Sequence, residues 1–168
     1  LGWLNSYHTF SFANYYNPKM MNFGMLRVLN DDTVVPAMGF GTHPHDNMEI
    51  ITLVLEGALE HKDSMGTGSV IYKDEVQVMS AGSGITHSEF NPSDKDGVKL
   101  FQIWIFPKEK NIKPRYDQKS FPISERKNKL IPAVSGLNKE GSLYIHQDAE
   151  IYLGNFEKGK KVNYQISN

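Results

Sequence analysis

Short strand-like segments separated by turns are the feature that most limits the folds open to this chain. Apolar or β-branched runs recur at similar spacing along its first part, with Gly, Asn or Asp residues between them. The clearest runs cover 49–55, 75–79, 85–90 and 100–106. No long stretch has the period of about 3.6 residues that marks an amphipathic helix. The pattern predicts an all-β barrel or sandwich.

The texture changes after this strand-rich part. Basic residues and four prolines dominate from Pro107 to Pro132, which predicts a connecting segment with one short helix at 124–128. Strand-like texture returns in the last part of the chain. In the first part, Asn and Asp residues also predict a turn. The further expected elements are a turn at 30–32 and strands at 142–146, 149–156 and 161–166.

Composition excludes several classes of protein. The 168 residues contain no cysteine, which rules out disulfide scaffolds, thiolate zinc sites, iron–sulfur clusters and cysteine nucleophiles. With 18 basic and 19 acidic side chains the net charge is −1, so we expect no direct nucleic-acid partner. No apolar run approaches the roughly 20 residues of a membrane span, so no membrane partner is expected. The absence of cysteine fits a reducing compartment, and the expected location is cytoplasmic.

Two His-x-His/Glu pairs carry the chemistry that the sequence predicts. His43 and His45 form one pair, and His87 and Glu89 form the other. Residues at i and i+2 of a strand point to the same face, so two neighbouring strands would aim these four side chains at one point. Imidazole and carboxylate ligands suit Fe(II), Ni(II), Co(II), Mn(II), Cu(II) or Zn(II). Glu49 competes with Glu89 as the carboxylate ligand, or it orients a histidine from behind.

Further side chains near these pairs are expected to line a substrate pocket. Phe40, Met79 and Ile85 flank the pairs and would supply apolar walls. His61 is also expected at the pocket, with a simple place at the end of a strand as the alternative reading.

Several motifs resemble the pirin family of the cupin superfamily. The segment GFGTHPH at 39–45 resembles the first metal motif of that family, and VQVMSAGSGITHSE at 76–89 resembles its second block. The opening GWLNSYHTFSF at 2–12 and QIWI at 102–105 fit as well. The resemblance implies a double-stranded β-helix (cupin) barrel that is the first of two. It also implies that one divalent metal is held by the residues matching His43, His45, His87 and Glu89.

Domain boundaries follow from the same resemblance. It implies an N-terminal metal-binding cupin barrel over 1–120. Residues 121–168 would then be a connecting segment and the incomplete start of a C-terminal cupin domain, with the rest of that domain lying beyond this sequence.

The resemblance is especially close to bacterial members with quercetin 2,3-dioxygenase activity. It implies a metal-dependent dioxygenase that opens flavonols, with a small planar aromatic substrate and dioxygen as its partners and Fe(II) as the favoured metal. A carboxylate, Glu89 or Glu49, would accept the proton of the flavonol hydroxyl.

Two alternatives remain open from the sequence. The first is a non-enzymatic, iron-binding redox sensor that docks to a protein partner, either a transcription factor or a metabolic enzyme. The second is a zinc-dependent isomerase or hydrolase, because one barrel fold can host many chemistries.

Overall fold

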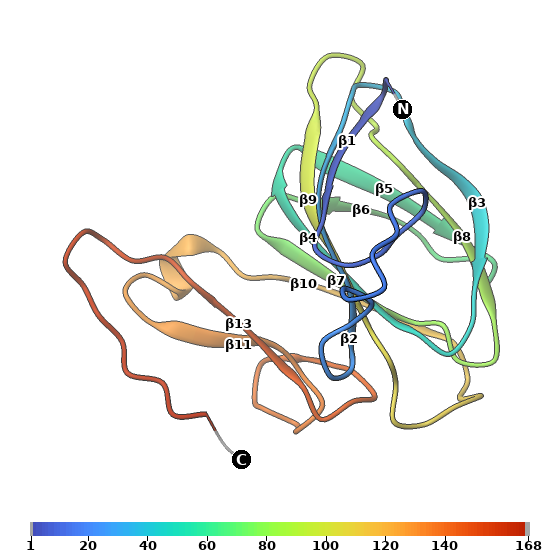
Figure 1. Ribbon diagram of the computed structural model, residues 1–168. Coiled ribbons are helices and arrows are strands. Elements are labelled where there is room, and N and C mark those ends of the chain that lie inside the picture. The colour runs from blue at the N-terminus through green and yellow to red at the C-terminus, as the bar shows by residue number, and fades with distance from the viewer. Residues whose placement is uncertain (1, 167–168) are drawn as a thin grey trace.

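The computed structural model describes residues 2–166, which form two facing β-sheets and a smaller third sheet (Figure 1). A six-stranded sheet with the order β1-β2-β9-β4-β7-β10 faces a four-stranded sheet with the order β3-β8-β5-β6. The third sheet, β12-β11-β13, lies against the outside of the six-stranded sheet. The strands are β1 (Leu4–His8), β2 (Leu26–Val34), β3 (Gly39–His45), β4 (Glu49–Glu56), β5 (Ala58–Asp63), β6 (Gly68–Tyr72), β7 (Glu75–Ser80), β8 (Ile85–Phe90), β9 (Val98–Ile105), β10 (Arg115–Ser120), β11 (Leu130–Ser135), β12 (Leu143–Tyr144) and β13 (Glu150–Gly154).

The all-β prediction is confirmed. In the described part of the chain the helical structure is limited to the 3-10 turn η1 (Ile123–Glu125), which overlaps only the first two residues of the short helix predicted at 124–128. No helix within residues 2–166 is long and apolar enough to span a membrane.

Strand β4 lies between β7 and β9 and is buried on both faces, which explains its nearly continuous apolar sequence. Ile50 packs inside the barrel against Met79 and Ile85. Its neighbour Ile51 points the other way, into a core shared with Val134 of the third sheet. The apolar core therefore continues from the barrel into the part of the chain that carries the third sheet, residues 130–154, which we call the C-terminal lobe.

Two local predictions are wrong. The expected turn at 30–32 lies inside β2, which pairs with β9 without interruption from Val28 to Val34. Asn30 and Asp32 are 2% and 3% exposed, because their side chains face the interior of the barrel. Turn-forming residue types were thus mistaken for a turn where they line a cavity. The strand expected at 161–166 has no counterpart, since no strand is formed after β13 in the part of the chain that the structure describes.

The segment predicted as a connection also contains regular structure. Strand β10 pairs with β7 along its whole length and completes the six-stranded sheet, and β11 is the central strand of the third sheet. Both were missed because charged residues and proline obscure their alternation. The domain boundary expected after residue 120 falls at the end of β10.

Candidate metal centre

Strands β3 and β8 position the histidines. They pair antiparallel, with His43 opposite His87, while His45 follows two residues later on the same face. The two strands approach each other so closely at Gly39, opposite Phe90, that a side chain there would collide with the β8 backbone. The predicted meeting of three imidazoles from two strands is confirmed.

The three rings form a compact group, with one nitrogen of each lying within 4.8 Å of the others. His43 donates its Nδ1 proton to the carbonyl oxygen of Gly41 (2.7 Å), which leaves its Nε2 lone pair free. The Nε2 atoms of His45 and His87 are buried and have no hydrogen-bond partner. Buried polar atoms without partners are costly, so these two nitrogens, together with the free Nε2 lone pair of His43, fit a bound metal ion. These three histidines form a metal site.

Burial keeps two of these imidazoles, those of His87 and His45, neutral. It lowers the pKa of His87 to about 2, and the neighbouring histidines lower it further. The pKa of His45 falls to about 4 for the same two reasons, with Asp46 opposing them. Metal ligation requires neutral imidazole, so the environment favours the ligating form at neutral pH.

Glu89 lies two residues after His87 on β8 but does not belong to the group of three. Its carboxylate accepts hydrogen bonds from Gln102 Nε2 at 2.8 and 2.9 Å and a longer one from Thr52 Oγ1 at 3.4 Å. Burial raises the pKa of Glu89 to about 7, although the hydrogen bonds from Gln102 and Thr52 lower it. Glu89 is thus a buried carboxyl group held in place beside the metal site.

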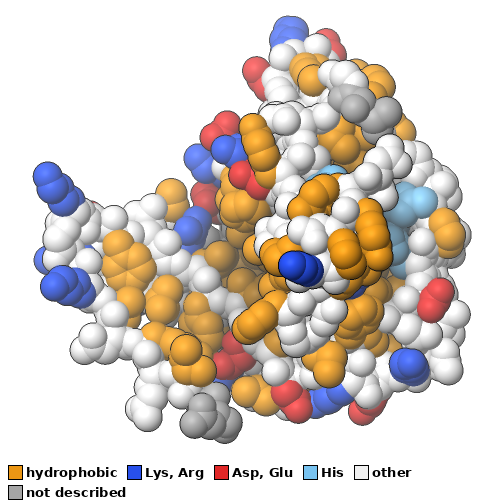
Figure 2. Space-filling view, in the orientation of Figure 1, with side chains coloured by type: hydrophobic (Ala, Val, Ile, Leu, Met, Phe, Trp, Pro, Cys, Tyr) orange, Lys and Arg blue, Asp and Glu red, His pale blue; other side chains and the backbone are white. Residues whose placement is uncertain are grey.

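A cavity of about 460 Å³ opens beside the metal site. Figure 2 shows histidine side chains next to a cluster of hydrophobic side chains on this face. His43 and Glu89 form part of the cavity wall. The aromatic part of the lining consists of Phe12, Tyr15, Phe40 and Trp104. This size and lining are typical of a site for a small apolar ligand.

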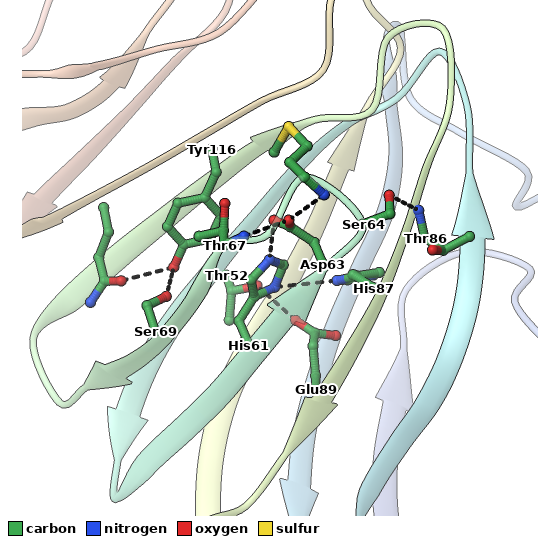
Figure 3. Close-up of polar contacts among 12 residues, drawn as sticks. Thr52, His61, Asp63, Ser64, Thr67, Ser69, Thr86, His87, Glu89 and Tyr116 are labelled. Carbon is green, nitrogen blue, oxygen red and sulfur yellow. Dashed lines mark hydrogen bonds and ion pairs between the residues drawn. The ribbon is translucent and has the colours of Figure 1, made fainter.

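The other residues predicted for the pocket lie elsewhere. Met79 and Ile85 pack in the buried core with Ile50 and do not line the cavity. His61 is fully buried on β5 outside the cavity lining, and its ring lies 5.3 Å from that of His87 (Figure 3). Of the four predicted pocket residues, Phe40 is the one in the cavity wall.

Glu49 is not brought to the metal site. It points to the outer face of β4, where it is 1% exposed and accepts a hydrogen bond from Ser80 (2.8 Å). Its other oxygen lies 3.6 Å from Nδ1 of His146, which comes from the C-terminal lobe. Glu49 therefore joins the barrel to that lobe and does not orient a metal-binding histidine.

Sequence reasoning missed a row of polar residues on the inner face of the six-stranded sheet. Asn30, Gln102, Thr52 and Gln77 are opposite one another on β2, β9, β4 and β7. Each is at most 7% exposed. Gln102 and Thr52 hold Glu89, and Asn30 and Gln102 of this row form a polar floor of the cavity next to the aromatic wall. Polar residues within otherwise apolar strands were the available signal.

Asp32 also lines the cavity, and burial raises its pKa although Ser6 and His8 lower it. A raised folded-state pKa destabilises the folded protein as the pH rises above the unfolded value of about 3.9, because ionised Asp32 must stay buried. Asp32→Asn should raise the thermal midpoint by about 2–4 °C at pH 8 and by less at pH 4. Asp31→Asn, on the outer face of β2, is the matched control. Equal effects of the two changes at pH 8 would contradict this account.

Comparison with known families agrees with the geometry. The model of the pirin family matches residues 1–105. The chain belongs to the pirin family. A second model, described as the quercetinase C-terminal cupin domain, matches residues 133–168. The predicted pirin-type cupin barrel with part of a second cupin domain is therefore confirmed.

Several curated relatives of this pirin-family chain are bacterial proteins. Quercetin 2,3-dioxygenase of Escherichia coli K12 is 49% identical over 166 residues, which cover 99% of this chain and 71% of that protein. A pirin-like protein of Caulobacter vibrioides is 43% identical over 166 residues, or 98% of this chain and 71% of that protein. The crystal structure of the pirin YhhW of E. coli in complex with nickel(II) superposes with a TM-score of 0.85 at 51% identity. That match covers 90% of this chain, which spans 64% of the solved chain.

Proposed function

We propose that this barrel is the metal-holding part of a flavonol 2,3-dioxygenase, which opens quercetin-like substrates with dioxygen and releases carbon monoxide. The observation that carries the proposal is the position of the three-histidine site at the wall of an aromatic cavity. The identity of 49% to a quercetin 2,3-dioxygenase supports the same substrate class.

Each part of the cavity has a role in this proposal. The aromatic wall, with Phe40 and Trp104, would pack on the planar substrate and exclude water. A bound divalent metal would act as a Lewis acid toward the adjacent hydroxyl and carbonyl oxygens of the flavonol. Glu89, held by Gln102, would accept the proton of the substrate hydroxyl through its carboxylate. Before substrate binds, Glu89 is also the proposed fourth ligand, and that role would require its carboxylate to turn from Gln102 toward the histidines.

Fe(II) is the metal that we propose, because three imidazoles and one carboxylate with open positions suit it. Ni(II) is the first alternative, since the solved E. coli relative is a nickel(II) complex. The same ligands also suit Co(II), Mn(II), Cu(II) and Zn(II). Elemental analysis of the protein purified without added metal tests this choice: iron supports it, and stoichiometric zinc or nickel overturns it.

Turnover tests the proposed activity. The metal-free protein is loaded anaerobically with Fe(II) or, in parallel, Ni(II), and quercetin and air are then added. We expect the flavonol absorbance to fall and carbon monoxide to be released, at a rate well above that of the free metal. A rate equal to that of the free metal would overturn the enzyme proposal and favour a metal-sensing protein that acts through a protein partner.

A further inference from the structure

Two buried residues lie behind the metal site and away from the cavity. His61 and Asp63 are on β5, which pairs with β8 so that Asp63 is opposite His87. Both side chains are 0% exposed, and neither lines the cavity. The ring of His61 also packs on the ring of Tyr116, with the centroids 4.7 Å apart. Neither residue lines the cavity, and His61 meets the metal site at the ring of His87.

A chain of hydrogen bonds joins these residues to the metal ligand (Figure 3). Asp63 Oδ2 lies 2.8 Å from His61 Nε2, and His61 Nδ1 lies 3.4 Å from His87 Nδ1. The second carboxylate oxygen, Oδ1, accepts hydrogen bonds from the backbone N–H groups of Met65 and Thr67 at 2.9 and 3.1 Å. Both oxygens of Asp63 are therefore committed as acceptors.

These contacts fix the position of each proton. A carboxylate only accepts, so His61 carries its proton on Nε2 and presents a lone pair at Nδ1. His87 must then donate from its own Nδ1. Its lone pair consequently lies on Nε2, the buried atom that has no other partner and belongs to the metal site.

We propose that Asp63 and His61 are positioning residues that set the tautomer of His87, so that its Nε2 lone pair faces the metal. The proposal rests on the metal site of the proposed function and adds two residues that lie outside both the group of three histidines and the cavity lining. Partners of this kind, which hydrogen-bond the second nitrogen of a ligating imidazole, commonly control metal affinity.

Asp63→Asn tests the proposal because it is isosteric and yet reverses the polarity of the chain of hydrogen bonds. The amide oxygen of the substituted side chain must keep accepting from Met65 and Thr67, so its NH2 group points at His61 Nε2. His61 then has to carry its proton on Nδ1, and His87 has to move its proton to Nε2. The ligating lone pair is lost although no ligand has been replaced.

Two measurements report this change. We record 1H–15N correlation spectra of the metal-free protein with 15N-labelled histidine. In Asp63→Asn we expect the proton of His61 on Nδ1 in place of Nε2, and the proton of His87 on Nε2 in place of Nδ1. Affinity for Ni(II), measured by competition with a chelator, should fall about 10- to 100-fold. Asp46→Asn is the control. Asp46 is exposed and adjoins His45 in the sequence, but its carboxylate is hydrogen-bonded to Asn47 and to no imidazole nitrogen. Unchanged tautomers, or an affinity equal to that of the control, would overturn the proposal.

A second pair of variants decides the matter if Asp63→Asn does not fold. In His61→Gln the amide can donate to Asp63 and accept from His87, whereas His61→Leu can do neither. We expect His61→Gln to retain more Ni(II) affinity than His61→Leu, and equal affinities would contradict the proposal. Failure of the wild-type protein to bind Ni(II) would refute the metal site itself, whereas the tautomers of the metal-free protein test the positioning role separately.

Discussion

His87→Ala is expected to abolish stoichiometric metal binding while the barrel remains folded. The change removes one of three converging imidazoles, so affinity for Ni(II) or Fe(II) should fall by at least about 100-fold, more than the loss of a positioning partner costs. Folding should persist because the barrel is held by apolar clusters on either side of the site. Elemental analysis measures the metal content, and a cooperative thermal transition of the metal-free variant reports the fold.

Glu49→Gln is the matched control for that experiment. Glu49 was a sequence-based rival for the carboxylate ligand, but its oxygens are bound to Ser80 and lie next to His146 on the other face of β4. Its replacement should leave the metal content unchanged. Normal metal content in His87→Ala, or loss of metal in Glu49→Gln, would contradict the assignment of the site.

Gly39→Ala is expected to destabilise the barrel and to weaken metal binding together. A Cβ atom at this position would collide with the carbonyl oxygen of Glu89 and would lie 2.5 Å from Cα of Phe90, both of which are backbone atoms. Strand β3 would have to move away from β8, and the two strands carry all three histidines. We expect the free energy of unfolding to fall by about 2–3 kcal/mol in urea titrations, with weaker Ni(II) binding.

Gly41→Ala provides the control on the same strand, two residues away. A Cβ atom there meets nothing within 4 Å, and the carbonyl oxygen that binds His43 is retained. Its effect on the free energy of unfolding should stay within about 0.5 kcal/mol. Similar losses in the two variants would show that the close approach of β3 to β8 is not what makes Gly39 necessary.

Much of the metal site was predictable because strand periodicity is local. The i, i+2 spacing of His43 and His45 on one strand fixed a shared face, and His87 followed from a second such pair. The choice between Glu49 and Glu89 was not predictable from periodicity, because β4 is buried on both faces and its inner face cannot be identified from the sequence. The structure separates the two through the contacts of each carboxylate.

The positions that escaped prediction depend on contacts distant in sequence. Asn30 is a residue type common in turns, and the sequence therefore predicted a turn there. Its pairing with Gln102, which is distant in the sequence, places it on the cavity floor. His61 lies within β5, before its end at Asp63, and its place against His87 results from the pairing of β5 with β8. Local patterns predicted the strands, whereas the pairing of strands decides which polar residues share a site.

Anomalous diffraction from crystals of the metal-loaded protein, recorded at the absorption edge of the bound metal, tests the central claim most directly. A single peak is expected between the Nε2 atoms of His43, His45 and His87, at roughly 2.0–2.2 Å from each. A peak elsewhere, or coordination of the metal without His87, would contradict the assignment of the site.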